Sequence, residues 1–333
     1  MSKWKTDNWE VSEYNWMKEV REGMTPPDGF ELHDITMRDG AHVVDFSDKE
    51  RTQLAEALSD LGVHRLEIES RARMIRLQSI YPPESHWETL SNIANMGLKA
   101  RIFTMRNVVE GRDGIDKALE CDVPNIVLQE PVQRGWLKRL GQTEEDRVED
   151  IREVVTYAKD RGCYVDFFTN HVCLSDPDYL LRIVKAGVEA GSDSLCITDS
   201  EGIGTPQTFS FLVQKFIEAS GGRLPVEVHP HNDFGLALAI TIASYGAGAS
   251  VVHCCVNNLG SRAGNTSLEE AVVALHVLYG VDLGLDYSKL YDVCSLVETM
   301  QQWPVAKNRP FSGYGINEAP YKLQYFGKQP HEK

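Results

Sequence analysis

The sequence predicts an α/β protein built as a (β/α)8 TIM barrel, with an aromatic N-terminal arm and a short helical and irregular C-terminal extension. Short β-rich runs alternate with amphipathic helical stretches eight times along the chain. The runs recur at intervals of about 25 to 40 residues, which is typical of parallel βαβ units. Eight such units favour a closed barrel over an open sheet, and 333 residues are enough to build one.

The expected strands are Phe30–Thr36, Arg65–Ser70, Lys99–Thr104, Asn125–Gln129, Tyr164–Phe168, Ser194–Thr198, Pro225–His229 and Ser250–Cys254. Between them, Glu144–Arg161 has the clearest helical pattern, with apolar residues at steps of three and four. Ser47 precedes a stretch whose third residue is acidic, which predicts a capping box. Glycines just after helical stretches predict left-handed C-caps at Gly62, Gly97, Gly162 and Gly191.

Three regions are expected: an arm at 1–29, a catalytic barrel at 30–280 and an extension at 281–333. The arm carries four aromatic residues, Trp4, Trp9, Tyr14 and Trp16. Exposed aromatic surface is unfavourable, so the arm is expected to pack on the barrel or on a partner subunit. The extension is helical to about Met300 and then rich in proline and glycine. The arm and the short tail lead us to expect a homodimer or a larger assembly.

Composition excludes several classes of partner. The formal net charge of −15 argues against nucleic acids and anionic membranes, because their phosphates would be repelled. No run approaches the roughly 18 consecutive apolar residues of a transmembrane helix, and residues 1–10 lack the apolar core of a signal peptide. We therefore expect a cytoplasmic protein. The seven cysteines contain no CxxC pair, so we expect reduced thiols packed as small apolar groups.

The strongest local signal for chemistry is His229-Pro230-His231, which ends the seventh expected strand. Residues two apart in an extended chain face the same way, so both imidazoles can bind one cation. Pro230 lacks a backbone donor, which is tolerated at a strand end. Taken alone, the pattern is also compatible with two surface or hydrogen-bonded histidines.

A second signal, Arg38 followed by Asp39, leaves the first expected strand. Alone, such a pair is typical of a turn or a solvated ion pair. In a barrel, however, the first and seventh strands end at the same rim, where barrel active sites form. Asp39 is therefore expected to converge with His229 and His231. These ligands suit a Mn, Zn, Mg, Co or Fe ion and leave positions open for water or substrate.

Other polar residues follow the expected strands at the same rim. The loop at 257–265 contains glycines that permit close backbone approach, and Asn265 has a side-chain oxygen suited to a hard cation. An ordinary polar loop is the alternative. Glu67 ends the second strand, Arg106 follows the third and Thr198 ends the sixth. Each is weak evidence alone, but together they match the polar rim of a barrel active site.

Three segments in register resemble the DRE-TIM metallolyase superfamily: DITMRDG (34–40), HPHNDFGLALA (229–239) and NNLGSRAGNTSLEE (257–270). The resemblance covers roughly residues 30–310. That superfamily includes isopropylmalate, homocitrate and citramalate synthases, 3-hydroxy-3-methylglutaryl-CoA lyase and 4-hydroxy-2-oxovalerate aldolase. It implies a divalent metal ion held by Asp39, His229 and His231, with Asn265 as an outer or additional ligand. It also implies that Arg38 binds the substrate and its oxyanion, that Glu67 is the acid ending the second strand, and that Thr198 contacts a substrate carboxylate.

The chain departs from the superfamily at several positions. Ala41-His42 stand where the synthases commonly have Glu-Gln, and Asn170, followed by His171, replaces a glutamate late on the fifth strand. Leu259-Gly260-Ser261 stand where the lyase has a cysteine-bearing glycine loop. The synthases continue into subdomains that supply a catalytic histidine, and the tail of this sequence resembles only the start of that region. The motifs are closer to the synthases and the length is closer to the lyases.

The leading interpretation is a metal-dependent, Claisen-type condensation of an acyl-CoA with a 2-oxo acid. The ion would be Mn, Zn, Mg or Co and would stabilise a developing alkoxide, with Arg38 adding charge-assisted hydrogen bonds. Expected substrate contacts are Arg38, Arg106, Asn170 and Thr198, and the candidate bases are His171 and Glu67. One alternative is a lyase or aldolase that cleaves a 3-hydroxyacyl-CoA or a 4-hydroxy-2-oxo acid. Another is a barrel that binds ligand without catalysis, which Asn170 supports.

Overall fold

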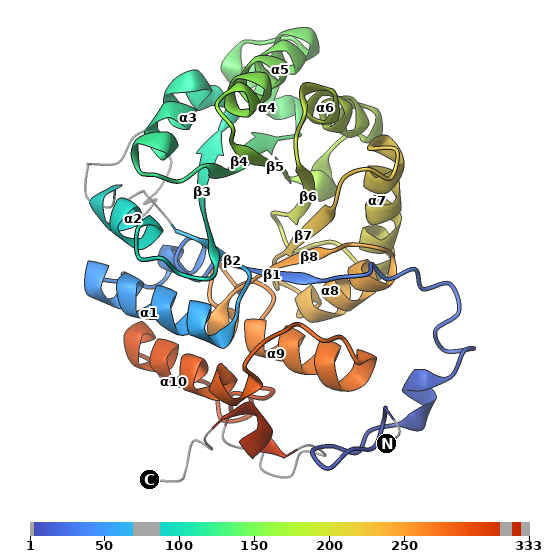
Figure 1. The fold of residues 1–333 in the computed structure, drawn as a ribbon. Helices are drawn as coiled ribbons and strands as arrows, with labels where there is room; N and C mark the ends of the chain where they lie inside the picture. The colour runs from blue at the N-terminus through green and yellow to red at the C-terminus, as the bar shows by residue number, and fades with distance from the viewer. Residues whose placement is uncertain (1–2, 69–86, 314–321, 328–333) are drawn as a thin grey trace.

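A computed structural model describes residues 3–68, 87–313 and 322–327 of the chain. Its described strands form one closed barrel in the order β1 to β8, and every neighbouring pair is parallel. Helices surround the strands on the outside (Figure 1). The predicted (β/α)8 barrel is therefore confirmed.

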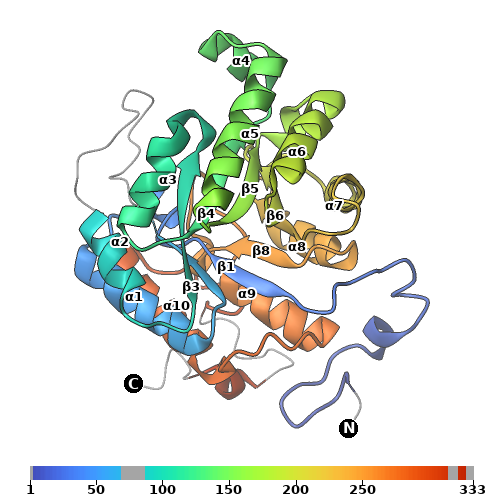
Figure 2. The same cartoon turned by 45° about the horizontal axis from the view of Figure 1, so that its top comes forward.

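The strands are β1 Glu31–Asp34, β2 Arg65–Glu67, β3 Arg101–Asn107, β4 Asn125–Pro131, β5 Tyr164–Asn170, β6 Ser194–Asp199, β7 Val226–Pro230 and β8 Val251–Cys254. The α-helices are α1 Asp48–Leu61, α2 Trp87–Ala94, α3 Gly111–Glu120, α4 Arg134–Leu140, α5 Glu144–Asp160, α6 Pro177–Ala190, α7 Pro206–Ala219, α8 Ala237–Gly246, α9 Leu268–Val273 and α10 Leu290–Gln301. In the tilted view, α4 lies beyond the end of α5, farther from the strands (Figure 2).

Local sequence signals explain why several helices begin and end where they do. Ser47 accepts a hydrogen bond from the Glu50 backbone and Glu50 reciprocates, so the predicted capping box is confirmed. The apolar face predicted for α5 is buried at all five of its positions, Val148, Ile151, Val154, Val155 and Ala158. Gly62 and Gly191 are left-handed C-caps, as predicted. The C-cap of α5 is Arg161, with Gly162 one residue later, and Gly97 lies three residues after the end of α2.

Two strand boundaries differ from the prediction in ways that matter for the site. β1 ends at Asp34, two residues early, because the Asp34 carboxylate accepts hydrogen bonds from the backbone and hydroxyl of Thr36 and starts a turn. β3 continues three residues beyond Thr104 to Asn107. The last two residues of the expected strand Arg65–Ser70 lie outside the described residues, as does part of the proline- and glycine-rich tail.

The inside of the barrel is filled by two kinds of buried side chain. A small apolar cluster, Phe103, Val127, Phe168 and Cys196, is separate from the main core between strands and helices. Beside it lies a layer of buried charged and imidazole groups, His33, Glu67, Asp166, Glu227 and His253. Alternation along each strand sends every second residue into the interior. The barrel is therefore a packed core with polar groups beneath its mouth.

The aromatic arm packs against the C-terminal half of the chain, as the blue trace in Figure 1 shows. Trp9 lies edge-on to His276 and Tyr325, with ring centroids 5.2 and 5.5 Å away. The Arg21 guanidinium lies 4.1 Å from the Trp16 ring, and the Thr25 backbone N–H donates to the Gly246 carbonyl. These contacts bury part of the apolar surface of the arm on the same subunit.

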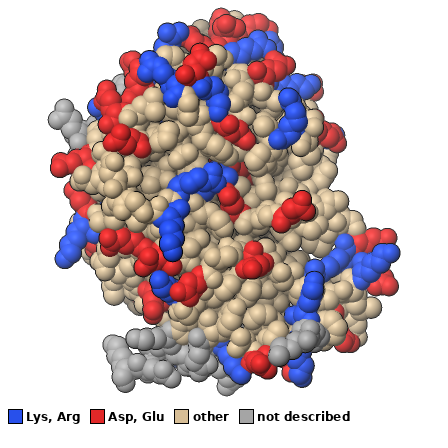
Figure 3. Space-filling model, viewed as in Figure 1, with Lys and Arg blue, Asp and Glu red and all other residues tan. Residues whose placement is uncertain are grey.

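The surface carries charges of both signs, and the cysteines form no disulfide bonds. Acidic and basic side chains are interspersed over the face of Figure 1, as Figure 3 shows. No helix among the described residues has both the length and the apolar character needed to cross a bilayer. All seven cysteines are free thiols, and each is buried except for the half-buried Cys173.

Candidate functional site

A tight turn after β1 carries the first two site residues to the mouth of the barrel. The Ile35 carbonyl accepts hydrogen bonds from the backbone N–H groups of Arg38 (3.0 Å) and Asp39 (2.8 Å). Both side chains are nearly completely buried. The early end of β1 at Asp34 therefore turns the chain back over the strand ends.

The structure brings Asp39 together with two histidines, His229 in β7 and His231 just after it. Asp39 Oδ2 lies 3.8 Å from His229 Nε2 and 3.6 Å from His231 Nε2. Potential ligand atoms of the three residues all lie within 4.8 Å of one another, and all three residues are buried. One cation between them would contact one carboxylate oxygen and two imidazole nitrogens, a donor set that divalent transition metals accept.

The protonation states of these groups suit a cation. Burial by itself would raise the pKa of Asp39. The hydrogen bond with His42 and the charges of Arg38 and His231 outweigh it and hold that pKa well below its usual range. Burial, reinforced by the nearby Arg38 charge, lowers the pKa of His229 well below its usual value. The site therefore holds an anionic carboxylate and a neutral imidazole, the forms that bind metals.

Asn265 supplies a further observation that fits a metal ion. Its Nδ2 donates to Asp39 Oδ2 at 2.6 Å and to the Leu259 carbonyl at 3.1 Å. Its Oδ1 is buried and has no hydrogen-bond partner in the described part of the chain. A buried acceptor without a donor is unfavourable unless something else binds it. The donors at this site therefore fit a divalent ion, with Asn265 Oδ1 as an additional oxygen.

Glu67 holds Arg38 in place from inside the barrel. Arg38 Nε and Nη2 donate to the two Glu67 carboxylate oxygens at 2.7 and 3.3 Å, a fork that only arginine can form. The Arg38 guanidinium also lies 5.8 Å from the Phe168 ring centroid. Glu67 is fully buried and does not line the cavity at the mouth of the barrel. Its geometry suits positioning Arg38 better than the expected role of a general base.

A cavity of about 170 Å³ opens at this mouth. Seven of the residues expected at the site line it: Arg38, Asp39, Asn170, His171, Thr198, His229 and His231. The remaining lining residues are His42, Met105, Gln129, Phe168, Ser200 and Ser261. Most of these residues carry a hydrogen-bonding group, and Met105 and Phe168 are the apolar ones. A cavity of this size and polarity suits a small, polar ligand.

Arg106 was expected to contact substrate, but the structure does not place it among the residues that line the cavity. Because β3 continues to Asn107, Arg106 lies within the strand instead of after it. Its guanidinium lies 4.5 Å from the Trp87 ring centroid and donates to Thr104 at 2.9 Å. Neighbouring residues of a strand face opposite sides, so Met105 enters the cavity while Arg106 faces the surrounding helices.

His171 has a hydrogen-bonding partner, Glu201, that the sequence did not predict. Its Nδ1 lies 2.5 Å from Glu201 Oε1, and its backbone N–H donates to Ser200 Oγ at 2.8 Å. The residue adopts a left-handed conformation with φ of 62° at the end of β5. Glu201 follows β6 closely, so its place after a strand at the active rim was the available signal. The pair presents an imidazole oriented by a carboxylate to the cavity.

His42, which departs from the sequence common among the synthases, is another residue of the site. Its Nδ1 lies 2.6 Å from both Asp39 Oδ1 and Ser261 Oγ. Ser261 Oγ also donates to Asp39 Oδ1 at 3.2 Å. The outer oxygen of Asp39 is therefore occupied by these two side chains, which leaves Oδ2 facing the two histidines. This arrangement orients the carboxylate toward the proposed cation.

Gly260 allows the 257–265 loop to approach Asp39 and Asn265. A Cβ at this position would overlap the Asn265 amide nitrogen and lie 3.3 Å from Asp39 Oδ2, and the φ of the residue is +136°. We expect Gly260→Ala to lower the free energy of unfolding by about 1–3 kcal/mol more than Gly141→Ala does, because of overpacking. Gly141 also has a positive φ, but an added methyl group meets no described atom within 4 Å. Equal losses in chemical denaturation would contradict this steric role.

Comparisons with known proteins find related sequences and a similar fold. The HMGL-like family model matches residues 29–297. Homocitrate synthase AksA of Methanothermobacter thermautotrophicus is 34% identical over 87% of this chain and 72% of that protein. (R)-citramalate synthase CimA of Methanocaldococcus jannaschii is 34% identical over 85% of this chain, which spans only 55% of that protein. The HMG-CoA lyase of Bacillus subtilis has the same fold, with a TM-score of 0.70 and 17% identity over 85% of this chain and 97% of that one.

Proposed function

Because the chain belongs to the HMGL-like family, within the superfamily that its motifs resemble, we propose that it is a divalent-metal-dependent enzyme that condenses an acyl-CoA with a 2-oxo acid. The observation that carries the proposal is the grouping of Asp39, His229, His231 and Arg38 around one small cavity. The names of the relatives, homocitrate and citramalate synthases, support the condensing direction.

The proposed metal ligands are Asp39, His229 and His231, with Asn265 as an outer or additional ligand. A bound Mn, Zn, Mg or Co ion supplies Lewis acidity to the oxygen of the 2-oxo group. The buried carboxylate gives the site a negative charge that attracts a divalent ion, and the neutral imidazoles do not repel it.

Arg38 is proposed to bind the oxygen on which negative charge develops as the carbon–carbon bond forms. Its guanidinium is pre-oriented by two bonds to Glu67, so little reorganisation is needed during the reaction. Thr198 and Asn170 line the same cavity and offer a hydroxyl and an amide to the substrate carboxylate. These residues determine how the 2-oxo acid lies relative to Arg38.

His171 is proposed as the base that removes a proton from the carbon next to the thioester. An ionised Glu201 only accepts hydrogen bonds, so the proton between the two side chains lies on His171 Nδ1. The other nitrogen, Nε2, then carries the lone pair that accepts the substrate proton. Glu201 also stabilises the imidazolium that results.

The decisive assay measures release of free CoA from acetyl-CoA, in the presence of a divalent metal and a panel of small 2-oxo acids. Thiol formation that depends on the 2-oxo acid supports the proposal. Formation of pyruvate or an acyl-CoA from hydroxy acids would favour the lyase or aldolase instead. Tight metal binding without either reaction would favour a non-catalytic barrel.

Glu201→Gln tests the orienting partner of His171. We expect kcat to fall roughly tenfold, because one charge-assisted hydrogen bond contributes about 1.5 kcal/mol and tenfold corresponds to 1.4 kcal/mol. KM for the 2-oxo acid should stay close to its original value. The matched control is Glu189→Gln, which alters an exposed glutamate paired with Arg152. An unchanged kcat in Glu201→Gln would contradict the proposed dyad.

A further inference from the structure

A chain of buried polar groups runs from the interior of the barrel to His229. We propose that Arg65, Glu227 and His253 are positioning residues that fix the ring of His229, so that its Nε2 presents a lone pair to the metal ion. This inference rests on the metal site proposed above. It assigns a role to a charged layer that the proposed reaction does not otherwise use.

Successive residues of this series lie within hydrogen-bonding distance of one another, and all of them are buried. Arg65 Nη1 donates to Glu227 Oε1 at 2.7 Å, and Glu227 Oε2 lies 3.0 Å from His253 Nε2. His253 Nδ1 lies 3.4 Å from His229 Nδ1. The four residues are at most 3% exposed, so water does not compete for these contacts. β2, β7 and β8 each supply at least one member, and all are parts of the rigid barrel.

The position of each hydrogen follows from the carboxylate. An ionised Glu227 only accepts hydrogen bonds, so His253 must carry its hydrogen on Nε2. His253 Nδ1 then has a lone pair, and it can only accept the hydrogen of His229 Nδ1. His229 is left with its lone pair on Nε2, the atom that faces Asp39. One buried carboxylate thus selects the tautomers of two successive histidines, as partners of metal-binding histidines commonly do.

Arg65 maintains the negative charge that this series of hydrogen bonds requires on Glu227. The Arg65 guanidinium forms an ion pair with Glu227 Oε1 at 2.7 Å, which balances the charge of this carboxylate inside the barrel. Two other groups near His253 Nε2, Asp166 Oδ2 and Cys196 Sγ, lie farther away, each at 3.8 Å. The 3.0 Å contact with Glu227 is therefore the dominant one.

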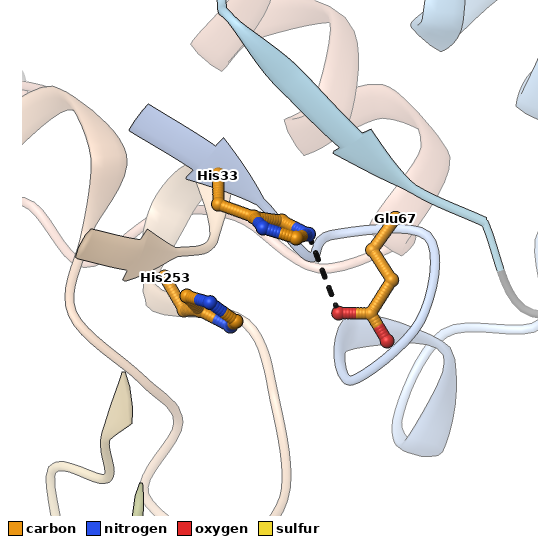
Figure 4. A group of neighbouring side chains, drawn as sticks. All are labelled: His33, Glu67 and His253. Atoms are coloured by element: carbon orange, nitrogen blue, oxygen red, sulfur yellow. Dashed lines mark ion pairs between the residues drawn. The ribbon is translucent and has the colours of Figure 1, made fainter. Parts of the chain in front are cut away.

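The same layer contains a second group that resembles a metal site. Figure 4 shows the rings of His33 and His253 one above the other, with Glu67 directed at His33; the ring centroids are 4.2 Å apart. Potential ligand atoms of these three residues lie within 4.8 Å of one another. However, Glu67 is paired with Arg38 and Glu227 with Arg65. The guanidinium groups already balance these carboxylates, which favours a positioning layer over a second cation site.

His33 also provides a matched control for the test. It is a fully buried histidine in the same layer and stacks on His253. Neither of its ring nitrogens has a hydrogen-bond partner in the described part of the chain. Replacing it with phenylalanine removes an imidazole from this layer without breaking the proposed chain. Replacing His253 with phenylalanine removes the acceptor of His229 Nδ1 while keeping a flat ring.

The experiment measures Mn²⁺ binding to His253→Phe, His33→Phe and the wild type by the electron paramagnetic resonance signal of free Mn²⁺. We expect His253→Phe to raise Kd by about 10- to 100-fold, the usual effect of losing the partner of a metal-binding histidine. His33→Phe should bind one ion with nearly the wild-type Kd. Unchanged Kd in both variants, or the same increase in both, would overturn the proposal. Two ions per wild-type chain, one of them lost in His33→Phe, would overturn it as well.

A second measurement does not depend on whether the variants fold. Nitrogen-15 spectra of the imidazoles in the zinc-loaded wild type should show the hydrogen on Nδ1 of His229 and on Nε2 of His253. The opposite tautomer of His253 would refute the chain of hydrogen bonds. A wild type that binds no Mn²⁺ refutes the proposed metal-dependent function itself. One bound ion with normal affinity in His253→Phe refutes the positioning role alone.

Discussion

Arg38→Ala is expected to lower kcat by about 10²–10³-fold, the usual effect of removing one oxyanion donor. Arg38 lines the cavity beside the proposed metal ligands and is held by both oxygens of Glu67. Its charge is therefore oriented before substrate arrives. Steady-state kinetics with the substrates identified in the thiol-release assay would measure the effect. Near-normal turnover would show that Arg38 has no such role.

The Arg38 experiment needs two controls because the residue is buried. Removing one partner of a buried ion pair costs about 3–5 kcal/mol, so Arg38→Ala also strains the fold by leaving Glu67 unpaired. Arg38→Lys keeps the charge but loses the two-pronged contact with Glu67, and we expect it to remain well below the wild type in kcat. Arg152→Ala changes an exposed arginine and should leave kcat unchanged. Thermal unfolding of each variant separates loss of fold from loss of catalysis.

Removal of the metal ion is expected to abolish activity. Asp39, His229 and His231 are the only acid and imidazole groups among the described residues that line the cavity and also form a potential metal cluster. Without a cation, the 2-oxo group loses its Lewis acid, and the buried Asp39 charge repels the substrate carboxylate. Dialysis against a chelator should therefore eliminate turnover, and adding Mn, Zn, Mg or Co should restore it. Elemental analysis before and after dialysis measures the ion.

Asp39→Asn provides the genetic counterpart of chelation. The amide keeps the shape of the side chain but removes its charge and its strongest ligand atom, so metal affinity and activity should fall together. Chelator supplied with an excess of metal controls for inhibition by the chelator itself. Full activity of a protein that has been shown to be free of metal would contradict the proposed chemistry.

Much of the fold follows from patterns that are local in the chain. Each expected strand overlaps an observed one, and the buried face of α5 follows from apolar residues spaced by three and four. The capping box at Ser47 depends on two residues of the same turn. Such signals involve residues that are close in sequence, so these features can be predicted without knowledge of the tertiary structure.

An error in the predicted end of a strand matters most where it changes the side of the sheet to which a side chain points. The predicted end of the third strand at Thr104 left Arg106 in a rim loop, whereas the observed strand reaches Asn107. Once a residue is inside a strand, its face is determined by alternation, and a difference of one position reverses it. The same effect explains why Met105, which carried no signal for chemistry, lines the cavity.

The order of strands at one rim is enough to predict that Asp39, His229 and His231 approach one another, because the carboxyl ends of all eight strands lie at the same end of a barrel. The residue types and their spacing therefore determined the candidate metal site from sequence. Only the tertiary structure decided that Glu67 contacts Arg38, that Glu201 contacts His171 and that His253 contacts His229. Those pairs come from different strands and loops, so their contacts depend on strand register and barrel closure, which no local pattern encodes.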